Sequence, residues 1–168
     1  MKNWRVLFLA LFILVVSLSC SLFTGTGTTT TGGSKSNQGL GASGMEPKPS
    51  GVIDKVTLAK GTQGAAKDPV NPTTVFSTTD TFHAVVHITQ APTATQFKAI
   101  WYSVDDGVAA EANKVIDSSD ITADGTVNID FYLTPTSSWP TGTFQVEIYV
   151  NGVLDQVENF SVKGTSKQ

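Results

Sequence analysis

The fold is decided by the stretch Thr-Phe-Gln-Val-Glu-Ile-Tyr-Val-Asn-Gly at residues 143–152. Its apolar side chains Phe144, Val146, Ile148 and Val150 alternate with Gln145, Glu147 and Tyr149. This period of two predicts a strand with one buried face. The Asn-Gly pair suits a type I′ turn, so we expect a hairpin that returns through Val162. Such a hairpin is not stable alone in water and requires a partner sheet.

Similar short runs recur from residue 51 onward, separated by Gly, Pro and Asp. We expect strands at residues 52–60, 81–89, 95–103 and 126–134, with weaker ones at 74–77 and 111–116. Residues 61–72 and 135–142 are expected to be connections, the second holding Trp139 as a plug at one end of the fold. The one alternative to strand structure is a single helical turn within residues 108–115. About seven short strands predict an all-β domain, a single antiparallel two-sheet sandwich.

Composition excludes one partner class. Only 15% of the 168 residues are charged, and the net charge is −3. Without residues 1–19 the balance falls to nine basic and 14 acidic side chains, a net charge of −5. A nucleic-acid partner requires a basic patch to neutralise phosphates, and the sequence has none. We therefore expect no nucleic-acid partner.

The first 19 residues are typical of a secretory signal: Lys2 and Arg5 precede an apolar run at residues 6–16. That run is shorter than the roughly 20 residues of a membrane-spanning helix. The only cysteine of the chain, Cys20, follows directly. A lone thiol in an exported protein requires an explanation.

Residues 16–20, Val-Ser-Leu-Ser-Cys, resemble the lipobox of bacterial lipoproteins, with the small Ser19 before the cleavage point. Ser17 stands where that family more often has Leu. The resemblance implies removal of residues 1–19 and attachment of diacylglycerol, usually with an N-acyl chain such as palmitate, at Cys20. Two or more acyl chains hold a protein stably on a bilayer. A lipid-anchored protein on the extracytoplasmic side of the cell envelope is therefore expected, with an ordinary signal peptide or uncleaved anchor as the alternative.

Residues 20–50 comprise the lipidated cysteine and a Thr-, Gly- and Ser-rich stretch with almost no apolar side chains. Such a composition predicts a disordered tether. The globular domain is expected at residues 51–163, followed by a tail at 164–168.

Two stretches of this domain resemble bacterial immunoglobulin-like and fibronectin-III-like modules: Phe97–Trp101, with a central-strand Trp, and Trp139–Gly152, with its strand and hairpin. The resemblance implies an immunoglobulin-like sandwich. The chain departs from it in two respects, because it has no cysteine pair to join the sheets and Phe144 occupies the place of the corner tyrosine. The resemblance is at the level of the fold and implies no catalytic residues.

No catalytic or metal-binding motif is evident. His83 and His87 lie four apart on a predicted strand, about 13 Å from each other, too far to share one ion. We expect both side chains to face solvent. Residues 120–125 begin like a calcium loop, but Phe131 stands where the loop requires Glu. A looser surface calcium site near Gly125 stays open. The chain has no Gly-x-Ser-x-Gly motif and no phosphate loop. We expect no cofactor, no metal and no enzymatic activity.

Three side chains suggest a binding surface. Ile100, Tyr102 and Tyr149 share the outward parity of strands that neighbour each other in an immunoglobulin-like order. An exposed aromatic patch suits a protein partner or a sugar ring. The alternative is that these side chains cover the sheet face under loops or lie against long side chains. The leading hypothesis is therefore a binding or structural module for protein or envelope contacts. The alternative is a carbohydrate-binding accessory that uses these aromatic side chains.

Overall fold

The computed structural model describes residues 39–107 and 112–164. These residues contain strands and no helix, which confirms the all-β prediction. The seven strands are β1 (Ile53–Gln63), β2 (Asp68–Pro72), β3 (Val75–Ser77), β4 (Phe82–Asp105), β5 (Lys114–Leu133), β6 (Gly142–Val150) and β7 (Val153–Lys163). The signal segment, Cys20 and the tail from residue 165 lie outside the described residues.

All seven strands join one hydrogen-bonded sheet in the order β2-β1-β4-β6-β7-β3, and β5 pairs with β4 in addition. The prediction of a purely antiparallel fold is wrong, because β3 runs parallel to β7. Parallel neighbours need a long connection between them. Here the chain between β3 and β7 includes three other strands, so the connection is long enough. The sheet is therefore mixed.

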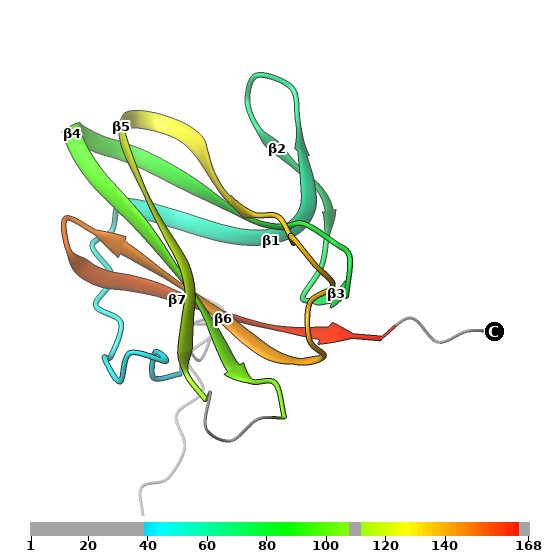
Figure 1. The fold of residues 1–168 in the computed structure, drawn as a ribbon. Coiled ribbons are helices and arrows are strands. Elements are labelled where there is room, and N and C mark those ends of the chain that lie inside the picture. Colours follow the sequence, from blue (N-terminus) through cyan, green and yellow to red (C-terminus); the bar gives the residue numbers. More distant parts are fainter. Residues whose placement is uncertain (1–38, 108–111, 165–168) are drawn as a thin grey trace, which may run out of the picture. The chain divides into compact units, whose positions relative to one another are not determined.

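The sheet folds over on itself because β4 bends in its middle. Gln90 and Ala94 have positive φ angles of 49° and 63°, and the pairing register with β5 shifts on either side of Ala91. Phe82 and Trp101, 19 residues apart on this strand, would lie roughly 60 Å apart if it were straight. Their ring centroids are 6.3 Å apart. β4 thus folds back, so that side chains from its two halves meet. β5 pairs with β4 along both halves (Figure 1).

Both halves of the folded sheet contribute to one apolar core. Phe82 from the first half contacts the rings of Trp101, Phe144 and Phe160 from the second, with centroids 4.8 to 6.3 Å apart. Trp139 stacks on Phe82 at 4.6 Å, and its indole N–H donates to the Asp80 carbonyl over 2.8 Å. Trp139 is thus partly buried against the core, which agrees with the expectation that it packs onto the fold.

The hairpin of β6 and β7 has the predicted form. Asn151 and Gly152 have φ angles of 49° and 81°, as a type I′ turn requires. The less regular pattern of the return strand has a definite cause: Ile148 pairs with Gln156, whereas Tyr149 pairs with Leu154. Asp155 is therefore the extra residue of a β-bulge.

Several expected boundaries are wrong. The connection expected at residues 61–72 contains the end of β1 and the whole of β2, joined by a turn with Gly64 at a φ of 67°. The prolines of β2 fit there because β2 is an edge strand, where a missing N–H breaks no ladder. The breaks expected near Ala91 and Gly125 are bends inside β4 and β5. The helical turn considered at residues 108–115 lies partly outside the described residues, and its last two residues begin β5.

Candidate functional site

The structure brings the predicted surface residues together on the outer face of β4 and β6. Ile100 pairs with Glu147 across the two strands, Tyr102 with Gln145, and Tyr149 with Lys98. However, Tyr102 and Tyr149 are each only 6% exposed, and Ile100 is half-buried. The hypothesis of an exposed aromatic patch is therefore wrong for these side chains, and the alternative, in which they are covered, is confirmed. Strand β6 is buried on both faces, because Gln145 and Glu147 are 4% and 0% exposed.

The cover over this face is the chain upstream of β1. We call residues 41–50 the strap. Along β6, the backbone N–H groups of Ala42 and Ser43 donate to Gln145 Oε1 and to Glu147 Oε1, the second over 2.9 Å. Figure 1 shows the described upstream chain, in cyan, beside the hairpin of β6 and β7.

The second half of the strap binds β7. The Lys48 N–H donates to the Leu154 carbonyl over 2.8 Å, and the Ser50 N–H donates to Asp155 Oδ2 over 2.6 Å. The prediction of a disordered tether through residue 50 is thus wrong for the strap. Side-chain acceptors more than a hundred residues downstream hold it, and composition alone does not reveal them.

The strap fits closely at Gly41. A Cβ atom there would overlap Glu147 Oε1 and lie 3.2 Å from Leu154 Cδ2. Gly41 also begins a tight turn, in which its N–H donates to the Met45 carbonyl over 2.9 Å and its carbonyl accepts from the Gly44 N–H over 2.8 Å. Gly44 has a φ of 81°, which L side chains rarely adopt. Gly41 therefore allows the strap to approach Glu147 and Leu154 closely, and Gly44 allows the turn.

Glu147 lies at the centre of the covered face. Its Oε2 accepts the Tyr149 hydroxyl over 2.5 Å, while Oε1 accepts the Ser43 N–H. Burial, reinforced by the Glu147 carboxylate, raises the pKa of Tyr102. Burial and the hydrogen bond to Glu147 also raise the pKa of Tyr149. Both hydroxyls therefore keep their protons at neutral pH and act as donors.

Two further polar side chains extend the covered face. Gln145 accepts from the strap and donates through Nε2 to Asn159 Oδ1 over 2.8 Å. Asp155, 1% exposed, accepts from Ser50 and, through Oδ1, from Gln156 Nε2 over 3.0 Å. Gln145, Glu147, Asp155, Tyr102 and Tyr149 together are called the strap face below. The sequence shows no signal for Asp155, because a bulge moves it out of the alternating pattern.

The two histidines lie on the first half of β4, before its bend. His83 Nδ1 lies 3.1 Å from both Asp130 oxygens and its ring stacks on Tyr132. His87 Nδ1 lies 2.8 Å from Asn128 Oδ1. Both rings are half-buried with cross-strand partners, so the expectation that they simply face solvent is wrong.

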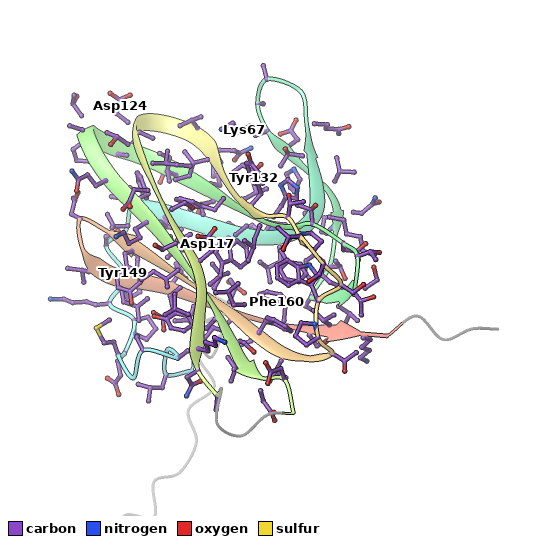
Figure 2. The ribbon with its side chains drawn as sticks, viewed as in Figure 1. Lys67, Asp117, Asp124, Tyr132, Tyr149 and Phe160 are labelled. Atoms are coloured by element: carbon purple, nitrogen blue, oxygen red, sulfur yellow. The ribbon has the colours of Figure 1, made fainter. Side chains whose placement is uncertain are left out.

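The acidic side chains near Gly125 are distributed along a strand. Residues 120–125 belong to β5, and Asp120 Oδ1 lies 3.4 Å from Lys98 Nζ. Asp117 and Asp124 lie well apart on β5 (Figure 2). Within residues 39–107 and 112–164, His, Cys, Asp and Glu nowhere form a group of three that could hold a metal ion.

In the described part of the chain, no helix is long and apolar enough to cross a membrane.

Comparison with known proteins identifies no family. No protein-family model and no curated protein sequence matches the chain. Among solved structures, the fold is similar to a Pseudomonas fluorescens alkylpurine DNA glycosylase bound to DNA containing an abasic site analogue. The identity is 13% and the TM-score 0.44, and the match covers 70% of this chain and 31% of the glycosylase.

Two other solved structures show weaker likeness. An uncharacterised protein from Bacillus anthracis str. Ames is 14% identical, with a TM-score of 0.35 over 54% of this chain and 76% of that one. The CARDB domain of a Pyrococcus furiosus protein, in complex with di-metal ions, is 12% identical. Its TM-score is 0.34 over 70% of this chain and 97% of that one.

One sequence-based expectation is corrected by these comparisons. The expectation that the protein is not an enzyme is contradicted by the glycosylase, which is an enzyme, and it is withdrawn. At a TM-score of 0.44 the likeness assigns no activity to this chain. A fold hosts unrelated functions, so activity has to be argued from a site.

Proposed function

We propose that this protein is a lipoprotein of the cell envelope, anchored through Cys20, that presents an immunoglobulin-like binding or structural module on the extracytoplasmic side. The observation that carries the proposal is the single cysteine directly after a signal-like apolar run. The module serves contacts with another protein or with the envelope. The net charge of −3 favours such partners over nucleic acid.

The immunoglobulin-like assignment is supported by the course of β4 and β5. Each strand contributes one part to each half of the folded sheet, as expected when strands cross between the two layers of a sandwich. Trp101 is 1% exposed at the centre of the core, which suits the central-strand Trp of such modules. The carbohydrate alternative is not retained, because Tyr102 and Tyr149 are not exposed to a sugar ring.

The anchor is tested by replacing its attachment atom. We expect the wild-type chain to fractionate with membranes and to carry acyl chains on an N-terminal Cys20 when analysed by mass spectrometry. Cys20→Ser should lack the acyl mass and retain residues 1–19, and Ser21→Ala should behave as wild type. An unmodified cysteine in the membrane-extracted wild-type protein would contradict the proposal.

A further inference from the structure

The strap occupies its face as a bound peptide would. Three of its backbone N–H groups donate to side-chain acceptors of the strap face: Gln145, Glu147 and Asp155. Two of these donors, Ala42 and Ser43, lie in the turn that begins at Gly41. Every non-proline residue of another chain that follows the same course offers such a donor. Main-chain donors supply affinity in the binding of extended peptides, and side-chain pockets supply selectivity. The acceptors can therefore receive segments other than the strap.

The strap leaves the two carboxylates of its face without a cation. Glu147 and Asp155 are 0% and 1% exposed, and the ion pairs within the described residues include neither of them. Burying a carboxylate is costly unless a positive charge accompanies it. Lys48 is the only basic residue of the strap, and its side chain is exposed. A segment that adds a basic side chain would match the charge of this face better.

A hollow beside Asp155 provides space for that side chain. It has a volume of about 240 Å³ and lies between residues 48–50 of the strap and the turn that joins β6 to β7. Val150 and Val153 line it together with Asp155. Long basic side chains place their methylene stems on apolar surface and their charged ends at polar groups. The hollow, which Lys48 of the strap also lines, offers apolar surface for such a stem beside Asp155.

The strap lies outside the sheet and outside the main apolar core. It contributes no strand to the sheet, and the main apolar core contains none of its residues. Most of its residues are exposed, and it is held mainly by hydrogen bonds to β6 and β7. Segments with few buried apolar contacts open at low free-energy cost. The strap face can thus exchange the strap for another segment that follows the same course.

We propose that the strap face is the docking site for a protein segment that follows the course of the strap and carries a basic side chain, which displaces residues 41–50 and pairs with Asp155. The strap is then the internal occupant that the partner replaces. The inference rests on the proposed binding module and names its surface and partner chemistry. It does not depend on the lipid anchor, so the Cys20 experiment and the one below fail independently.

The test uses the full-length chain in non-ionic detergent and two labelled probe peptides. Both have the sequence of residues 39–50; one carries Pro49→Arg and the other Pro49→Gln, and position 49 lines the hollow. We expect the Arg peptide to bind at least tenfold more tightly than the Gln peptide. Hydrogen exchange of the chain's own residues 41–50 should become faster when the Arg peptide binds. Equal affinities, or binding that leaves the strap protected, would overturn the proposal.

Two variants locate the effect. Asp155→Asn keeps an acceptor for the Ser50 N–H and should lose the tenfold preference, while Asp124→Asn, with the same charge change at an exposed site, should keep it. A preference that survives in Asp155→Asn would refute the pairing. Should Asp155→Asn prove unfolded, wild-type binding is measured against ionic strength. The preference for Arg should then fall as salt rises, and a salt-independent preference refutes the proposal.

Gly41→Val tests displacement directly. Its side chain would overlap Glu147 Oε1, so the strap should detach and exchange rapidly. With the competitor weakened, the Arg peptide should bind several-fold more tightly than to wild type. A detached strap with unchanged affinity would show that the strap and the peptide do not compete for one face.

Discussion

The two faces of β6 are both buried, but by different physical means. The inner face carries Phe144, Val146 and Ile148, at 0 to 1% exposure, packed in the apolar core around Trp101. The outer face carries Gln145, Glu147 and Tyr149, buried under the strap through hydrogen bonds. Apolar burial is non-directional, whereas polar burial requires a partner for each donor and acceptor. The inner face therefore supplies stability, and the outer face supplies selectivity for what covers it.

The largest effect is expected from the inner face. Trp101→Ala should lower the free energy of unfolding by roughly 3–5 kcal/mol, because a large buried side chain leaves a cavity in the core. Denaturant titration measures the loss. Val153→Ala, at a residue 51% exposed, is the control and should change stability by no more than about 0.5 kcal/mol. A small loss for Trp101→Ala would mean that the core is not centred on this ring.

A smaller and more local effect is expected from the outer face. Glu147→Ala removes the acceptor of the Tyr149 hydroxyl and of the Ser43 N–H. This should lower the free energy of unfolding by roughly 1–3 kcal/mol. Hydrogen exchange should accelerate in residues 41–50 and remain slow in β4. Asp124→Ala, at the exposed bend of β5, should leave the free energy of unfolding and the hydrogen exchange of residues 41–50 unchanged. Uniform acceleration across the sheet would contradict the separation of the two faces.

The smallest effect at neutral pH concerns the tyrosine hydroxyl. The pKa of Tyr149 is raised in the folded state, so its contribution is fully present below the unfolded pKa of about 10 and is lost as the pH rises through the folded value. Each pH unit above about 10 costs about 1.4 kcal/mol per such group. The stability advantage of wild type over Tyr149→Phe should therefore narrow between pH 9 and pH 11. Denaturant titration of both proteins at each pH measures the difference.

Much of the fold follows from local pattern. The alternation in β6, the Asn151-Gly152 turn and the inward Phe82 and Phe131 were all predictable, because period-two patterning and positive-φ turns are local properties. β2 was missed because its prolines, typical of connections, are also tolerated on an edge strand. The parallel pairing of β3 with β7 joins residues far apart in the sequence, and a three-residue strand has too short a pattern to reveal a partner.

The candidate site was predictable only in part. Parity correctly placed Tyr102 and Tyr149 on one face of neighbouring strands. Their burial was one of the two alternatives, but the segment that covers them could not be predicted, because it has the composition of a linker and lies more than fifty residues upstream of Tyr102 and about a hundred upstream of Tyr149. Asp155 was missed for a different reason, since the bulge that buries it interrupts the alternation on which the prediction depended.

The sequence by itself determined the all-β class, the hairpin and the inner face of β6, because side-chain alternation and turn residues act over a few positions. Only the tertiary structure decided whether the outer face of β6 is buried or exposed. The Ser43 N–H and the Glu147 carboxylate are 104 residues apart in the chain and 2.9 Å apart in space. A polar side chain on a strand is exposed or buried according to what packs over it. That cover is a long-range contact, which no local pattern encodes.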